Sequence, residues 1–161
     1  MAKKLFIARH SFAEMGGGSS RQDFDRELTE QGLVLANKRG KKLYDMDMKP
    51  EALYSSTAVR ATQTAKILAD QMRFDNRSIK FDDALYNITL GDMLNWIGRL
   101  DENLNSVMIV GHNPVLSYLA EYLLDSTGLH MQPCDIVCID MHIASWMLID
   151  KNCGTQQMLD L

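Results

Sequence analysis

Short apolar runs alternate with amphipathic stretches along most of the chain. Four runs have the length and composition of buried strands, and they cover residues 4–8, 52–55, 79–81 and 106–110. Apolar residues at helical spacing follow each run and predict helices over residues 29–44, 57–72, 89–100 and 114–124. Strands that alternate with helices indicate a mainly parallel central sheet covered on both faces. The expected fold class is therefore α/β, as a three-layer α/β/α sandwich.

The pattern changes after residue 124. Three later segments are strand-like, at residues 135–140, 145–150 and 155–159. We therefore expect a C-terminal antiparallel hairpin at the edge of the sheet. The glycine- and serine-rich segment 14–20 predicts a mobile loop. The chain has no internal repeat and no linker-like stretch, so residues 1–161 are expected to form a single domain.

Composition narrows the class of protein. The formal net charge of −4 and the lack of a lysine- and arginine-rich stripe argue against nucleic-acid binding. The apolar run at residues 5–8 is too short for a signal peptide or a membrane span, so we expect a cytoplasmic protein without membrane contact. Three cysteines make a poor disulfide framework, and we interpret them as buried structural thiols rather than metal ligands. Without an exposed heptad pattern, a monomer is expected.

Basic side chains follow three of the predicted strands. Arg9 and His10 come directly after the first strand, and His112 follows the strand at 106–110. Arg60 lies near the start of the helix that follows the second strand. Ligands of parallel α/β sheets bind beyond the carboxyl ends of the strands, so these side chains are expected in one pocket. A basic pocket in an acidic protein indicates an anionic ligand.

Four motifs in these regions resemble those of the histidine phosphatase superfamily, which is phosphoglycerate mutase-like. The segments are Arg9-His10-Ser11, Arg26-Glu27-Leu28-Thr29-Glu30-Gln31-Gly32, Ser55-Ser56-Thr57-Ala58-Val59-Arg60-Ala61-Thr62-Gln63-Thr64 and Gly111-His112-Asn113. The short chain and the Pro114 that follows the last motif make it most similar to the SixA-type phosphohistidine phosphatases within that superfamily.

The resemblance implies a metal-independent phosphatase that needs no cofactor and works through a phosphohistidine on His10. Arg9 and Arg60 would bind the phosphoryl oxygens with charge-assisted hydrogen bonds, and a protonated His112 would add a cationic donor. Arg26 is the expected second-tier contact to phosphate or substrate. Two further substrate-binding candidates are Asn113, which would orient the pocket or donate directly, and Ser11, which replaces the usual glycine.

The general acid of many relatives is missing from the matching segment. They carry a glutamate that protonates the leaving alcohol, and Asn87 stands at that position in the run from Leu85 to Gly91. An amide cannot serve as that acid, so an alkoxide would leave poorly, whereas an imidazole is a less demanding leaving group. The substitution therefore favours phosphohistidine over sugar or glycerate phosphates. A carboxylate could still come from elsewhere, with four candidates: Glu14, Asp23, Asp82 and Asp92.

Three functions remain open at this point. The first is removal of phosphate from phosphohistidine in a signalling phosphotransfer protein. The second is a phosphomonoesterase for a small metabolite, which would need an acid at another position. The third is a non-catalytic phosphate-binding module, which the retained His10 and both arginines disfavour.

Overall fold

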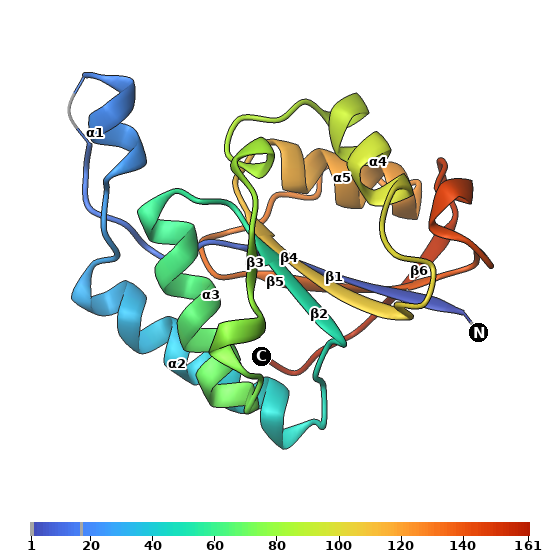
Figure 1. Cartoon of the computed structure of the whole chain (residues 1–161), viewed down its shortest axis with the longest axis horizontal. Helices are drawn as coiled ribbons and strands as arrows, with labels where there is room; N and C mark the ends of the chain where they lie inside the picture. Colours follow the sequence, from blue (N-terminus) through green and yellow to red (C-terminus); the bar gives the residue numbers. More distant parts are fainter. Residues whose placement is uncertain (1, 17) are drawn as a thin grey trace.

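A mixed sheet with helices on both faces forms the centre of the protein, as seen in a computed structural model that describes residues 2–16 and 18–161 (Figure 1). The sheet has six strands in the order β3-β2-β4-β1-β5-β6. Their bounds are β1 Lys3–Arg9, β2 Ala52–Ser55, β3 Lys80–Phe81, β4 Ser106–Gly111, β5 Ile136–Met141 and β6 Gly154–Gln157. The first four strands in spatial order run parallel, and β5 and β6 are each antiparallel to the neighbour before them. The expected α/β class and the edge hairpin are confirmed.

Two helices cover each face of the sheet. The helices of the chain are α1 Ser20–Phe24, α2 Glu30–Asp45, α3 Val59–Met72, α4 Leu90–Gly98 and α5 Val115–Leu124. Figure 1 shows α2 and α3 together on one side and α4 and α5 on the other. An apolar core lies on each face of the sheet, and the central strand β1 contributes side chains to both. Leu5 and Ile7 face the α4–α5 side, while Phe6 and Ala8 face the α2–α3 side.

Helix α2 lies close to α3 because glycine stands where the two helices meet. A Cβ atom on Gly40 would lie 2.7 Å from Cβ of Gln71. Ala36 and Leu43 are buried as the apolar pattern predicts. Leu33 and Tyr44, two further apolar residues of the same helix, are 39% and 44% exposed. Three small residues, Gly32, Ala36 and Gly40, therefore form the buried face of this helix together with Leu43.

The prediction of a strand over residues 145–150 is wrong. Trp146–Leu148 form a 3-10 turn, and the hydroxyl of Ser145 accepts a hydrogen bond from the backbone N–H of Met147. The Trp146 side chain is fully buried, and its indole N–H donates to the carbonyl of Leu104 at 2.9 Å. Burial of one large side chain here outweighs the apolar pattern that suggested a strand.

Helix α1 begins inside the segment that was expected to be a loop. Ser19 caps it, because its hydroxyl accepts from Gln22 N–H while the Gln22 side chain accepts from Ser19 N–H. Gly17, in the middle of the glycine run, lies outside the described residues. None of the five residues of α1 is buried, so polar contacts and one aromatic pair connect it to the rest of the protein.

The cysteines are free thiols. Cys134 and Cys138 are buried, and burial raises the pKa of each thiol to about 11; Cys153 is half-buried. Within residues 2–16 and 18–161, no group of three or more potential metal ligands occurs. Over the same residues, none of the helices is long and apolar enough to cross a membrane.

Candidate active site

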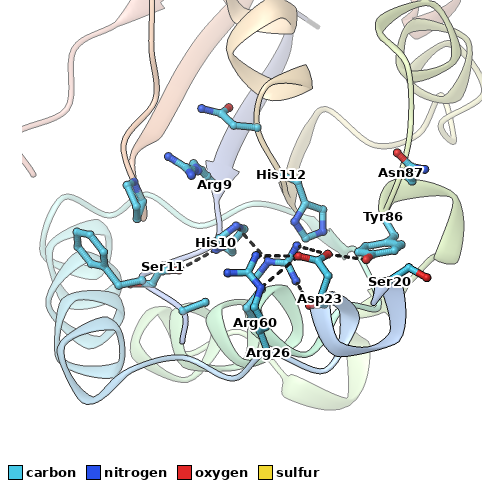
Figure 2. Close-up of a pocket in the computed structure, with 14 residues that line it drawn as sticks. Arg9, His10, Ser11, Ser20, Asp23, Arg26, Arg60, Tyr86, Asn87 and His112 are labelled. Carbon is cyan, nitrogen blue, oxygen red and sulfur yellow. Dashed lines mark hydrogen bonds and ion pairs between the residues drawn. The ribbon is translucent and has the colours of Figure 1, made fainter. Parts of the chain in front are cut away.

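The pocket lies where β1, β2 and β4 end side by side. Arg9 pairs with Gly111 across β1 and β4. The ladder continues one step beyond the strands, since His10 N–H donates to the Gly111 carbonyl and Ser56 N–H to the Val110 carbonyl, both at 3.0 Å. A cavity of about 560 Å³ opens at this edge (Figure 2). All seven site residues predicted from the sequence line it: Arg9, His10, Ser11, Arg26, Arg60, His112 and Asn113.

His10 is held in one tautomer and kept neutral. Its Nδ1 lies 2.7 Å from the carbonyl oxygen of Ser11, and a carbonyl only accepts, so Nδ1 carries the proton. The Nε2 lone pair then accepts from Nε of Arg60 at 3.3 Å. Burial, and next the nearby Arg60 and Arg9, lower the pKa of His10 to about 4. A neutral imidazole whose free lone pair lies beside a guanidinium can act as a nucleophile, because the guanidinium would hold an anionic substrate next to Nε2.

His112 lies beside His10, with ring centroids 5.3 Å apart. Its Nε2 is 2.8 Å from the hydroxyl of Ser56, and its buried Nδ1 has no hydrogen-bond partner among the described residues. Burial, and then electrostatic repulsion from His10 and Arg60, lower the pKa of His112 to about 3. Protonation of His112 is therefore disfavoured in this pocket, because its positive charge would lie near Arg60 and Arg26. A neutral His112 can still donate one N–H.

The three arginines reach the cavity from different elements. Arg9 ends β1, and its Nη1 donates to the carbonyl of Met131 at 2.9 Å. Arg60 lies in the first turn of α3 and its side chain is only 6% exposed. Arg26 follows α1, and its Nη1 donates to the carbonyl of Glu14 at 3.1 Å. Three guanidinium groups at one cavity make a site for a multiply charged anion.

Ser11 and Asn113 line the cavity with their polar groups already engaged. The Ser11 hydroxyl donates to the Gly32 carbonyl at 2.8 Å, and its N–H donates to Oγ1 of Thr64 at 3.0 Å. The Asn113 amide donates to the Met131 carbonyl at 2.8 Å and accepts from the Ser117 hydroxyl at 2.9 Å. These contacts suit residues that position the strand ends rather than residues that bind substrate directly.

Asp23 on α1 reaches across the pocket, as Figure 2 shows. Its Oδ2 is 3.2 Å from Nη2 of Arg60, its Oδ1 is 3.0 Å from Nη2 of Arg26, and the Tyr86 hydroxyl donates to Oδ2 at 2.6 Å. Among the described residues that line this cavity, it is the one carboxylate. The sequence identified it only as one of four alternative acids, and the short helix that positions it was not predicted.

None of the other proposed acids lies in this cavity. Asp82 accepts from the indole N–H of Trp96 at 2.9 Å, and Asp92 lies in the first turn of α4. Glu14 lines a separate surface cavity, and Asn87 borders the main one with an exposed side chain. The Tyr86 hydrogen bond, with Arg60 and Arg26, holds the pKa of Asp23 below its usual value. Asp23 is therefore ionised at neutral pH and carries no proton to give to a leaving group.

A second cavity of about 400 Å³ adjoins the first. The two share four lining residues, Tyr86, Asn87, His112 and Asn113. The described residues that line the second cavity include no arginine, lysine or carboxylate, and Ile88, Leu90 and Tyr118 give it an apolar character. A ligand with its anionic group at the arginines therefore has uncharged space next to it.

Comparisons with known proteins agree with this arrangement. The model of the histidine phosphatase superfamily (branch 1) matches residues 5–97. The structure of SixA from Agrobacterium tumefaciens superposes with a TM-score of 0.78 at 27% identity, covering 88% of this chain and 93% of that protein. The protein histidine phosphatase SixA in complex with tungstate also gives 0.78, at 23% identity, covering 96% of this chain and 94% of its own.

Relatives found by sequence match this chain over part or most of its length. The mitochondrial serine/threonine-protein phosphatase Pgam5 of Drosophila mojavensis is 29% identical over 80 residues, which are 49% of this chain and only 26% of the fly protein. The chain thus spans about a quarter of that relative. An uncharacterised chloroplastic protein of Arabidopsis thaliana is 24% identical over 154 residues, 91% of this chain and 70% of the plant protein.

The family match and the similarity of fold agree with each other. The matched region contains His10, Arg26 and Arg60, and the SixA structures share the sheet on which His10 and His112 meet. These findings support a phosphatase whose nucleophile is a histidine. The chain belongs to the histidine phosphatase superfamily, branch 1.

Proposed function

We propose that this chain removes phosphate from phosphohistidine in a signalling phosphotransfer protein, through a phosphohistidine formed on His10. The observation on which this rests is the state of His10, which is buried, neutral and protonated on Nδ1, with Nε2 next to Arg60. Arg9, Arg60 and Arg26 would neutralise the charge of the transferring group, which spreads over three equatorial oxygens.

The reaction has two displacement steps. In the first, Nε2 of His10 attacks phosphorus, the bond from phosphorus to the substrate nitrogen breaks, and that imidazole takes a proton from solvent. In the second, water attacks the phosphoryl group on His10, and His10 leaves as the neutral imidazole with inorganic phosphate as product. Ser11 and Asn113 position the strand ends in this scheme, and His112 donates through one ring N–H.

The choice of phosphohistidine as substrate rests on the lack of a ready acid among the described residues that line the cavity. Asn87 borders the cavity at the position of the family's glutamate, and Asp23 is paired with two arginines. A leaving imidazole accepts its proton readily, whereas an alkoxide requires a positioned donor. The adjoining uncharged cavity offers room for the leaving group and for the side chains that surround it on a protein.

The test measures phosphate release from a histidine-phosphorylated phosphotransfer protein, with a simple aryl phosphate assayed in parallel. We expect fast release from the phosphoprotein, slow turnover of the aryl ester, and a loss of at least about a thousandfold in His10→Ala. Quenching in alkaline detergent during turnover, where the phosphorus–nitrogen bond survives, should trap a ³²P label on the parent chain but not on His10→Ala.

A phosphomonoesterase for a small metabolite is the second candidate, because Asp23 does place a carboxylate in the cavity. Brisk turnover of alkyl or aryl esters without action on phosphohistidine would establish this alternative. Anion binding without any His10-dependent turnover would instead indicate a phosphate-binding module.

The setting of the activity is also a proposal. We propose a single domain over residues 1–161 that acts as a cytoplasmic monomer. One sheet combines β1 from the start of the chain with β6 from its end, which supports the first point. Three free cysteines suit a reducing compartment.

A further inference from the structure

Each of the three side-chain nitrogens of Arg60 has an acceptor within the protein. Its Nη1 donates to the backbone carbonyl of Asp23 at 2.7 Å, and its Nη2 lies 3.2 Å from the carboxylate of the same residue. Its Nε donates to Nε2 of His10 at 3.3 Å. Each nitrogen that would bind a phosphoryl oxygen therefore already has an acceptor, and one residue supplies two of the three.

Arg26 is occupied in the same way. Its Nε and Nη2 lie 3.2 and 3.0 Å from Oδ1 of Asp23. The carboxylate thus bridges two guanidinium groups, with one oxygen on each. This is the arrangement that a phosphoryl group, with its oxygens at similar spacing, would adopt between the same two side chains.

The element that carries Asp23 is weakly attached. Helix α1 has no buried residue, and the Asp23 side chain is 40% exposed. Its contacts with the far side of the pocket are the hydrogen bond from Tyr86 and the edge-to-face packing of Phe24 on the Tyr86 ring, with centroids 5.1 Å apart. Since α1 has no buried residue, moving it aside would break these polar contacts without opening the apolar core.

We propose that Asp23 is an internal competitor for the phosphoryl group, whose carboxylate binds Arg60 and Arg26 until substrate phosphate displaces it. This inference rests on the proposed function, because it takes Arg60 as a binding group for the phosphoryl oxygens. A dianionic phosphoryl group binds three arginines more strongly than one carboxylate does, so it displaces Asp23. After the reaction, competition from the Asp23 carboxylate weakens the binding of inorganic phosphate to the arginines and favours its release. Asp23 is in this sense a residue that sets affinity rather than a proton donor.

The sign of the effect distinguishes this role from a structural one. If Asp23 competes, its removal strengthens phosphate binding; if it only orients Arg60, its removal weakens phosphate binding. The probe is inorganic phosphate, titrated calorimetrically into the parent chain, Asp23→Asn and Asp23→Ser. We expect Kd to fall at least about fivefold in both variants, equivalent to about 1 kcal/mol.

Asp25→Asn is the matched control. It removes the same charge two residues away, where Asp25 pairs with the exposed Arg21 at 3.8 Å and does not line the main cavity. Its Kd should stay within about twofold of the parent value. Thermal unfolding of every variant shows that it is folded, and α1 contributes no buried residue to the core.

Three results would overturn the proposal: an unchanged or higher Kd in the Asp23 variants, an equal gain in Asp25→Asn, or no phosphate binding in any of these proteins. Because the titration needs no turnover, it is independent of the substrate. Tighter phosphate binding in Asp23→Asn, together with no His10-dependent hydrolysis, would contradict the proposed function while leaving the competitor role in place.

Discussion

The protonation state of His10 decides what this residue can do. The imidazole keeps its proton on Nδ1 because this N–H donates a hydrogen bond to the Ser11 carbonyl. Nε2 keeps its lone pair, which accepts a hydrogen bond from Arg60. Burial and the surrounding guanidinium groups disfavour a second proton. The same positive charges that would bind a phosphoryl group therefore also keep the nucleophile in its reactive form.

We predict that His10 stays neutral well below the usual histidine range. Long-range ¹H–¹⁵N spectra of the imidazole nitrogens should show the Nδ1–H tautomer at pH 6 and an apparent pKa about 4. The unfolded chain in urea is the control, since its histidines should titrate near about 6.5. Half-protonation of His10 near pH 6.5 in the folded protein, or an Nε2–H tautomer, would contradict the account of the nucleophile.

At the scale of elements, the first turn of α2 supports the loop that follows His10. Thr29 caps this helix through Gly32 N–H at 2.9 Å, and the Gly32 carbonyl accepts from the Ser11 hydroxyl at 2.8 Å. A Cβ atom on Gly32 would lie 2.1 Å from the backbone oxygen of Phe12. The glycine of this motif is therefore required by the close approach of two backbones.

We predict that Gly32→Ala destabilises the protein by about 1–3 kcal/mol, because backbone atoms cannot yield as a flexible side chain can. Phosphatase activity should fall as well, since the shift reaches Ser11. Urea unfolding measures the stability. Gly91→Ala is the control: it also lies in the first turn of a helix, has nothing within 4 Å of the added Cβ, and should be neutral or stabilising by up to about 1 kcal/mol. Equal effects of the two substitutions would argue against the close contact.

At the scale of the whole molecule, the pocket makes stability depend on pH. His10 and His112 are neutral in the folded protein, with pKa values of about 4 and about 3, but both become charged in the unfolded chain below pH 6.5. The unfolded state then binds more protons than the folded state, so stability decreases as the pH falls from about 6.5 towards 4.

We predict that the free energy of unfolding falls by roughly 2–4 kcal/mol between pH 7 and pH 5 through these two groups. The double variant His10→Asn, His112→Gln keeps similar hydrogen-bonding atoms without the titration, and should lose less stability over the same interval. Urea unfolding of both proteins at the two pH values measures the difference. An identical loss in the parent and the double variant would mean that other groups cause it.

The sequence by itself determined the alternation of strands and helices up to residue 124 and the basic residues that follow the strands. The strands at 4–8, 52–55 and 106–110 were predicted because continuous apolar runs require burial on both faces. Because they are parallel, their carboxyl ends had to meet, and this brought Arg9, His10 and His112 together. The local apolar pattern predicts the strands themselves, whereas the order in which they pair, β3-β2-β4-β1-β5-β6, comes from the fold.

Only the tertiary structure decided the properties that depend on neighbours distant in sequence. The neutral state of His112 follows from burial beside His10 and Arg60, and no motif records burial. Asp23 acquires its place between two arginines through a five-residue helix too short for a periodic pattern. Residues around Trp146 form a 3-10 turn instead of the expected strand, because the Trp146 side chain packs into the core. Periodicity describes which way side chains point, whereas charge state and close contact depend on what the fold places around them.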